Sequence, residues 1–413
     1  MLRNYMLIAY KVFMRRKLFT AINLACIVLT LIVLVVATAL LETLFFPSGV
    51  EGRSGRFLQV YTIQSESRDA NIQRTAGLGY KMIMRELKPM QGVERVSAFT
   101  KASPVSVYQG GQVSELQMRR VDADYWKILD FRLLAGRLPN EDDERMGRMV
   151  AVINASSAQR LFGAGVAVGQ DLTVGGQTFR VIGVVADVVH LNAFADSWAP
   201  VTTFPSTQYR EELVGNFAAL LLARQASDLP AIQQEVRRLA ANYVSEDPAR
   251  FAITRFPADT KADLVARQLI GSDREDDPGT AKLALMIGGA MLLFMLLPAL
   301  NLVNLNVGRI AERSAEIGVR KAFGATSLQL IGQLVVENLL LCLAGGLLGL
   351  AAARAVLWWL GESALIPYLD VGINLPVFAC GMLLAFVFGL LSGVIPAWKM
   401  SRLDPVHALK GNA

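Results

Sequence analysis

The chain has 413 residues, of which 53% are hydrophobic and 18% are charged, and its formal net charge is +6. Soluble domains are less apolar and about 25% charged, so this composition excludes a purely soluble protein and a disordered one. The long polar stretches between the apolar runs also exclude a chain that lies wholly within a membrane. We therefore expect a membrane protein that carries at least one folded aqueous domain.

Four apolar segments are long enough to cross a bilayer as helices, which takes about 20 residues. They are residues 18–41, 282–307, 328–360 and 377–398. Lysine and arginine gather before the first segment, between the second and third, and after the fourth, whereas residues 361–375 contain neither. Because cytoplasmic loops carry the excess of positive charge, this pattern predicts a multi-pass protein with cytoplasmic termini and an extracytoplasmic region at about 42–280. The basic balance then needs no nucleic-acid partner to explain it.

The first segment is predicted to be a retained span, because its apolar run exceeds the roughly 7–15 residues of a cleaved signal peptide. Its lead-in has apolar residues at helical spacing, which favours a helix along the inner membrane surface. We expect three parts. They are an interfacial helix with the first span at 1–45, an extracytoplasmic domain at 46–280, and three further spans with a C-terminal tail at 281–413.

The extracytoplasmic region has the pattern of an α+β domain. Strand-like runs are predicted at 56–63, 93–108, 113–120, 216–223 and 250–256, with helices at 79–87 and 228–243. Their order resembles a split βαβ arrangement, so we expect a ferredoxin-like subdomain interrupted by an α/β insertion at about 138–215. Cys26, Cys342 and Cys380 all fall in predicted spans, so this domain must be held by its core and not by disulfides.

No catalytic or metal-binding constellation is evident. His190 and His407 are predicted on opposite sides of the membrane, which excludes a Ser-His-Asp or Cys-His arrangement and a His-rich metal site. No phosphate-binding loop is present, so the chain cannot bind ATP in that way. The acidic cluster from Asp142 to Glu144 is expected in a solvated loop. The chain is predicted to be no enzyme and to hold no cofactor or metal of its own.

The segment between the second and third spans predicts a short cytoplasmic helix at 312–324. Glu316 and Arg320 form an i,i+4 pair in the favourable order, and Gly324 can end the helix. Ile317 and Phe323 leave it a partly apolar surface. Such a helix suits docking into a groove on a soluble partner, and packing on lipid head groups is the alternative.

The run EIGVRKAFGAT in this segment resembles the hallmark of the MacB/FtsX-type, or type VII, permeases of ABC transporters. The C-terminal run GLLSGVIPAWKMSRLDPVHALK is similar to the same family. In the extracytoplasmic region, the runs WKILDFRLLAGR and FRVIGVVADV resemble the family's periplasmic domain. The order of one span, an outside domain and three spans also agrees, so the resemblance covers nearly the whole chain.

The resemblance implies that residues 312–324 form a coupling helix that rests on an ATPase. The positions carried over to that contact are Glu312, Arg313, Glu316, Ile317, Gly318, Arg320, Lys321, Phe323 and Gly324. It also implies a dimer in the bacterial inner membrane, made with a second copy or a paralogous permease. Two ABC ATPase subunits, separate from this chain, would bind ATP and Mg²⁺ and drive motions that reach the extracytoplasmic domain, which is termed mechanotransmission.

Small and polar residues in the spans are candidates for helix packing. Gly345 and Gly349 form a G-x-x-x-G motif, which allows close approach either to a second copy or to a span of the same chain. Asn301 and Asn304 lie three residues apart on one face of the second span and can hydrogen-bond across helices.

The third span also contains two charged residues, Glu337 and Arg354. Charges within a membrane are functional candidates, but both lie within a few turns of a predicted span end. Snorkelling to the interface is therefore the simpler interpretation, and the roles of both residues stay open.

Three functions are compatible with these observations. The leading one is efflux of a periplasmic or membrane-anchored substrate that is a peptide, lipid-linked or drug-like. The second is regulation of an extracytoplasmic enzyme such as a cell-wall hydrolase. The third is a scaffold without an ATPase whose cytoplasmic helix packs on membrane lipid. A periplasmic adaptor would be a further partner, with the insertion as its expected contact.

Overall fold

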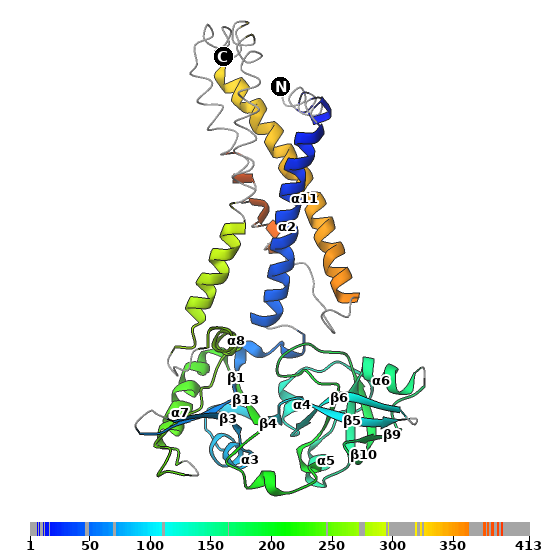
Figure 1. Cartoon of the computed structure of the whole chain (residues 1–413), viewed down its shortest axis with the longest axis vertical. Coiled ribbons are helices and arrows are strands. Elements are labelled where there is room, and N and C mark those ends of the chain that lie inside the picture. The colour runs from blue at the N-terminus through cyan, green and yellow to red at the C-terminus, as the bar shows by residue number, and fades with distance from the viewer. Residues whose placement is uncertain are drawn as a thin grey trace. The chain divides into compact units, whose positions relative to one another are not determined.

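The computed structural model describes most of the chain. The described residues are 17–45, 49–68, 72–109, 112–163, 165–244, 247–271, 277–294 and 326–362, with scattered positions between 6 and 15, at 296, 319 and 323, and between 375 and 390. The chain divides into two compact units (Figure 1). Residues 1–41 and 284–413 form a helical unit, and residues 42–283 form a globular unit.

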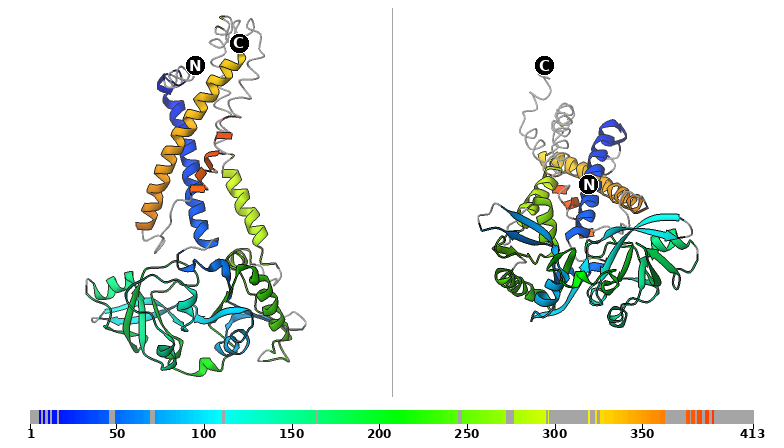
Figure 2. Two further views of the ribbon diagram at one scale, coloured as in Figure 1. Left: turned by 180° about the vertical axis from the view of Figure 1, so that it is seen from behind. Right: turned by 60° about the horizontal axis from the view of Figure 1, so that its bottom comes forward.

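The helical unit is built on α2 (Lys17–Phe45) and α11 (Ser327–Glu362), which run in the same direction and cross one another (Figures 1 and 2). In the described part of the chain, two stretches are long and apolar enough to cross a membrane, Thr20–Leu41 and Val335–Gly361. A shorter apolar helix spans Thr280–Phe294. The rest of the second predicted segment and most of the fourth lie outside the described residues.

The globular unit contains one continuous mixed sheet of 14 strands. Figure 2 shows these strands gathered in two neighbouring parts. Its first part comprises β1 (Phe57–Val60), β2 (Ile63–Glu66), β3 (Gln73–Leu78), β4 (Val93–Thr100), β12 (Val214–Gly215), β13 (Phe217–Ala223) and β14 (Ile253–Arg255). α3 (Tyr80–Met82), which continues as a π-helical turn (Ile83–Leu87), and α7 (Leu229–Asn242) accompany these strands. The helix α8 (Lys261–Ile270) follows β14.

The second part of the sheet continues the same path, in the order β11-β8-β10-β9-β5-β6-β4-β13. Its strands are β5 (Ser103–Gln109), β6 (Gln112–Val121), β7 (Leu133–Gly136), β8 (Val150–Asn154), β9 (Asp171–Val174), β10 (Gln177–Val185) and β11 (Ser197–Pro200). The helices among them are α4 (Tyr125–Ile128), α5 (Glu141–Arg145) and α6 (Ala155–Phe162). β8 and β10 pair parallel, whereas β10 pairs antiparallel with β9 and β7.

β13 is the central element of the first part. All seven of its residues are buried, and it pairs antiparallel with both β1 and β4. A strand covered on both faces reads as a continuous apolar run, which is the pattern of FAALLLA. One hydrophobic core on this sheet includes Leu221 of β13 and Val236 of α7. A second core surrounds Trp198 and Tyr125. A third core, around Phe179, fills the region of β8–β10.

Several predicted element boundaries were wrong. The predicted strand 56–63 ends early, as β1 at Val60, and a separate strand, β2, begins at Ile63 and pairs with a different neighbour. The predicted strand 93–108 breaks at Lys101-Ala102 into β4 and β5. β3, β7 and β11 had not been predicted. β7 is exposed at all four residues, so no alternation of apolar and polar residues marked it.

The acidic cluster is not a solvated loop, which corrects the sequence-based expectation. It forms α5, where Asn140 and Asp143 make a reciprocal capping box. The side chain of Asp143 is fully buried, and its carboxylate accepts hydrogen bonds from Arg137 at 2.5 and 3.0 Å and from Arg148 at 3.0 Å. A carboxylate paired with two arginines can be buried, because they supply charge-assisted hydrogen bonds. The run of acidic residues does not by itself predict these partners.

Candidate functional site

The predicted coupling segment is only partly described. Of the nine positions carried over to the ATPase contact, Phe323 is described and the other eight lie outside the described residues. Its side chain is 88% exposed, and that of Val319, four residues earlier, is 45% exposed. The N–H of Phe323 donates to the carbonyl of Val319 at 3.1 Å, which is a helical turn. Two apolar side chains thus lie open to solvent one turn apart.

The coupling segment leads directly into α11 through a capping box. The N–H of Thr326 donates to Oε1 of Gln329 at 3.0 Å, and the N–H of Gln329 donates to Oγ1 of Thr326 at 3.3 Å. This reciprocal pair satisfies donors that the first turn of the helix leaves without partners. α11, a helix of 36 residues, begins four residues after Phe323.

The two glycines of the G-x-x-x-G motif face α2 of the same chain. A Cβ atom placed on Gly345 would lie 2.6 Å from the side chain of Ile27, and one on Gly349 would lie 3.0 Å from that of Leu31. The backbone of α11 therefore approaches α2 as closely as glycine permits.

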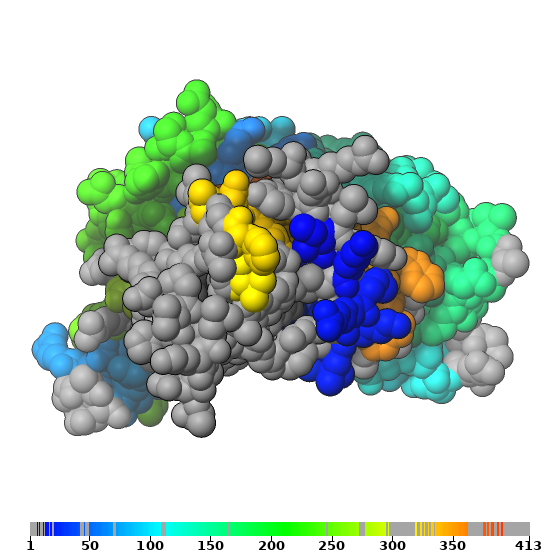
Figure 3. Space-filling view, turned by 90° about the horizontal axis from the view of Figure 1, so that it is seen from above, coloured from blue at the N-terminus to red at the C-terminus, as the bar shows by residue number. Residues whose placement is uncertain are grey.

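Both helices also begin on the face of the molecule seen in Figure 3, in blue for α2 and yellow for α11. Asn301 and Asn304 lie outside the described residues.

The two charged residues of the third span lie in different surroundings. Glu337 is 1% exposed, and its carboxylate accepts a hydrogen bond from Nε2 of Gln333 at 3.1 Å. Asn338, beside it, is also buried. Arg354 is exposed on the surface of α11. Arg354 is thus accessible on the helix surface, whereas Glu337 is buried, and the predicted snorkelling of both stays a prediction.

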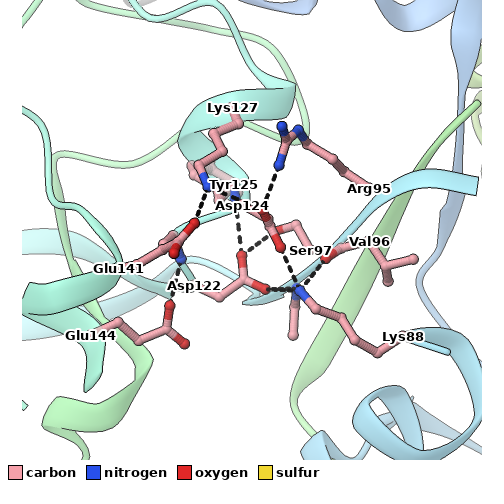
Figure 4. Close-up of polar contacts among 12 residues, drawn as sticks. Lys88, Arg95, Val96, Ser97, Asp122, Asp124, Tyr125, Lys127, Glu141 and Glu144 are labelled. Atoms are coloured by element: carbon pink, nitrogen blue, oxygen red, sulfur yellow. Dashed lines mark hydrogen bonds and ion pairs between the residues drawn. The ribbon is translucent and has the colours of Figure 1, made fainter. Parts of the chain in front are cut away.

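In the globular unit, a polar network joins β4, β6, α4 and the end of the π-helical turn (Figure 4). Nζ of Lys88 lies 2.6 Å from a carboxylate oxygen of Asp124 and 3.6 Å from one of Asp122. The Asp122 carboxylate accepts from Oγ of Ser97 at 2.7 Å and from the N–H groups of Ala98 and Tyr125 at 2.8 and 3.0 Å. Asp122 is thus a buried carboxylate with several donors around it.

The network extends to α5, because a carboxylate oxygen of Glu144 accepts from the N–H of Ala123 at 2.7 Å. Burial raises the pKa of both Asp122 and Glu144, although Lys88 opposes that shift. Burial alone would lower the pKa of Lys88, but the nearby Asp122 and Asp124 outweigh it and the pKa is raised. The arrangement ties α5 to the central strands, and we assign it to structure rather than to chemistry.

Within the described part of the chain, no group of three or more His, Cys, Asp and Glu side chains could hold a metal ion. Sequence reasoning missed the residues of the polar network, because Lys88 and Asp122 are brought together only by the pairing of strands. A buried charge in a sequence is indistinguishable from a solvated one until its partner is known.

Comparison with protein families defines the class of protein. The MacB-like periplasmic core domain matches residues 20–239, and the FtsX-like permease C-terminal region matches residues 288–405. The chain belongs to the MacB/FtsX-type permeases of ABC transporters and has a MacB-like periplasmic core domain. It is a membrane protein whose globular unit is an extracytoplasmic α+β domain. As an ABC permease without an ATPase domain in these 413 residues, it requires a partner ATPase subunit.

Individual relatives agree at low identity. The chain is 25% identical over 332 residues to the ABC transporter permease YknZ of Bacillus subtilis (strain 168), covering 79% of this chain and 78% of YknZ. It is 25% identical over 309 residues to the macrolide export ATP-binding/permease protein MacB of Chromobacterium violaceum, covering 72% of this chain and 45% of that one. The chain thus spans about half the length of its ATP-binding/permease relatives.

Two solved structures are also similar to part of the chain. The extracellular domain of YknZ has a TM-score of 0.39 at 17% identity and covers 48% of this chain and 98% of that domain. The periplasmic region of MacB from Actinobacillus actinomycetemcomitans has a TM-score of 0.40 at 16% identity and covers 55% of this chain and 98% of that region.

Proposed function

We propose that the chain converts ATP-driven motion on the cytoplasmic side into movement of its extracytoplasmic domain. The work done there would be efflux of a periplasmic or membrane-anchored substrate that is a peptide, lipid-linked or drug-like. The observation that carries this proposal is the coupling segment, which lies within the FtsX-like match and runs directly into α11 through the capping box at Thr326.

The assembly we propose has two permeases, either two copies of this chain or this chain with a paralogue, and two ATPase subunits that bind ATP and Mg²⁺. The chain would cross the bacterial inner membrane four times, with both termini in the cytoplasm. Residues 46–280 would lie outside as a ferredoxin-like subdomain with an insertion at about 138–215. Residues 312–324 would dock on the ATPase, and a periplasmic adaptor and membrane lipid are further partners.

The relatives support export more than they support a particular cargo. Several carry export in their names, for syringafactin, for macrolides and for pyoverdine. These names describe chemically different molecules, each at about 25% identity to this chain. We therefore propose export as the type of work and assign no single substrate.

The test removes the docking contact and leaves the rest of the chain intact. The double variant E316A/I317A should lose the co-purifying ATPase, because it removes a charge and an apolar anchor from the proposed coupling helix. The control E211A/V244A removes a charge and an apolar side chain that are both exposed in the extracytoplasmic domain. It should retain the ATPase.

The same pull-down from native membranes decides between the alternatives. Intact ATPase binding by E316A/I317A would contradict the proposed docking role. Recovery of the wild-type chain with no nucleotide-hydrolysing subunit would instead indicate a scaffold. A stable extracytoplasmic enzyme in the complex, without transported cargo, would indicate regulation of that enzyme.

A further inference from the structure

A buried ion pair joins the first described turn of the globular unit to α8. Glu51 lies in a 3₁₀ turn (Gly49–Glu51) that follows α2, and Lys261 is the first residue of α8. Nζ of Lys261 lies 2.9 Å from a carboxylate oxygen of Glu51, and the two side chains are 8% and 0% exposed. Removing one partner of an ion pair this deeply buried strongly destabilises the fold, because the other charge is left buried without compensation.

The same helix also holds the entry to the second span. Oγ1 of Thr280, at the start of the apolar helix Thr280–Phe294, donates to a carboxylate oxygen of Asp263 at 2.6 Å. Asp263 lies in the first turn of α8, where it forms a capping box with Thr260. The two connections between the extracytoplasmic domain and its neighbouring apolar helices therefore meet at one turn of α8.

α8 is itself fixed to the central sheet. Gln59 of β1 and Asp259 exchange two backbone hydrogen bonds of 2.9 Å, just before α8 begins. The Asp259 carboxylate also accepts hydrogen bonds of 2.9 and 3.0 Å from Arg267, one turn from the end of α8. A displacement of α8 must therefore move β1 with it.

The ion pair continues into the insertion through Asn192. The other carboxylate oxygen of Glu51 accepts from the N–H of Asn192 at 3.0 Å and from its Nδ2 at 2.8 Å. The Asn192 carbonyl accepts from Nη1 of Arg119 at 2.7 Å and from the hydroxyl of Tyr125 at 2.8 Å. The hydroxyl of Tyr61 lies 3.0 Å from Oδ1 of Asn192. All of these residues are buried.

This network differs from an exposed ion pair because it is buried and because its central carboxylate has several partners. An exposed ion pair can separate at little cost, because water replaces each partner. Here the carboxylate of Glu51 has the ammonium of Lys261 on one side and two N–H donors of Asn192 on the other, and these three residues lie far apart in the chain. A buried network with this many charge-assisted hydrogen bonds holds its arrangement more rigidly than an exposed pair does.

We propose that α8 is a clamp that makes the first and second spans move the extracytoplasmic domain as one body. Glu51 and Lys261 are its positioning residues, and Asn192 passes the displacement to the insertion. This inference rests on the proposed function, since it names the route by which the motion would enter the domain.

The experiment measures hydrogen–deuterium exchange of the full chain in complex with its ATPase, without nucleotide and after trapping with ATP and vanadate. The variant E51Q/K261M removes both charges of the pair and keeps the side chains similar in size, so neither Glu51 nor Lys261 is left as a buried charge without its partner. We expect it to retain ATPase binding and hydrolysis while the nucleotide-dependent change in exchange over residues 187–193 falls at least twofold. A purely structural role would alter exchange in both nucleotide states and leave their difference unchanged.

The matched control is E66Q/R255M, which removes a partly buried ion pair between β2 and β14 that lies outside the Glu51 network. It should show the same nucleotide-dependent change in exchange over residues 187–193 as the wild type. If E51Q/K261M and the wild type show the same nucleotide-dependent change in exchange, the inference is overturned and the proposed function still stands. No nucleotide-dependent change in the wild type would instead contradict the proposed function itself.

A second variant keeps the test decisive if E51Q/K261M does not assemble. N192A leaves the ion pair and the backbone N–H bond to Glu51 in place, and it removes the side-chain amide that donates to Glu51 and accepts from Tyr61. We expect at least a twofold smaller nucleotide-dependent change over residues 187–193. A wild-type change in an assembled N192A complex would overturn the proposed route.

Discussion

Gly345 and Gly332 lie in the same helix, α11, but in different surroundings. A Cβ atom at Gly345 would lie 2.6 Å from Ile27, whereas no described atom lies within 4 Å of one at Gly332. We expect G345A to lower stability by about 1–3 kcal/mol, because the two helices must separate to admit the methyl group. G332A should be neutral or slightly stabilising, since alanine favours a helix over glycine by about 1 kcal/mol.

Thermal unfolding of the detergent-solubilised chain measures this difference. Equal midpoints for G345A and G332A would show that α11 does not pack on α2 through its glycines. That result would leave contact with a second permease as the role of the motif.

Asp143 provides a pH-dependent test at the scale of one side chain. The hydrogen bonds from Arg137, more than any other cause, lower the pKa of Asp143 from its ordinary 3.8 to about 2. A carboxyl whose pKa is lower in the folded state stabilises the fold above its unfolded pKa, and this contribution disappears as the pH falls through the folded value. D143N should therefore destabilise the domain at neutral pH by about 1.5–3 kcal/mol, because hydrogen bonds to a charge are lost.

Denaturant unfolding of residues 49–271, at neutral pH and in steps down toward pH 2, measures the effect. The gap between wild type and D143N should narrow between pH 3.8 and about 2. The control D171N removes an ion pair with Arg180 that is exposed on both sides, and it should change stability by less than about 0.5 kcal/mol. A gap that is independent of pH would contradict the assigned ion pairs.

At the scale of elements, the N-terminal cap of α11 can be tested directly. T326A removes the hydroxyl that caps Gln329 and should cost about 1 kcal/mol of helix stability. T326S keeps an equivalent hydroxyl and should behave as wild type. Hydrogen–deuterium exchange over residues 327–331 should be faster in T326A alone, and unchanged exchange would mean that the cap does not define the start of the helix.

The comparison of predicted and observed elements shows where local patterns succeed. α7 and β13 were predicted within a residue or two, because an N-terminal capping pattern marked the helix and an unbroken apolar run marked the strand. β7 was missed because an exposed strand carries no alternation. α5 was taken for a loop because four acidic residues in succession resemble a solvated run until the partners of Asp143 are seen.

At the scale of the whole molecule, the extracytoplasmic domain forms its own compact unit with three buried clusters. All three cysteines lie outside it. We expect residues 49–271 alone to unfold in a cooperative transition whose midpoint does not change when a thiol reductant is added. Circular dichroism during heating tests this, and a gradual transition without a midpoint would mean that the cores depend on the membrane segments.

The sequence by itself determined the class of this protein: its apolar spans, the positive flanks that predict their orientation, the run EIGVRKAFGAT and the family. Each of these signals is local, because a period, a charge bias or a motif acts over a few turns of chain. Only the tertiary structure decided that Glu51 meets Lys261, that Asp143 is buried and that Gly345 faces α2. These are pairings between distant segments, and burial changes the energy of a charge or a glycine only once its partner is in place.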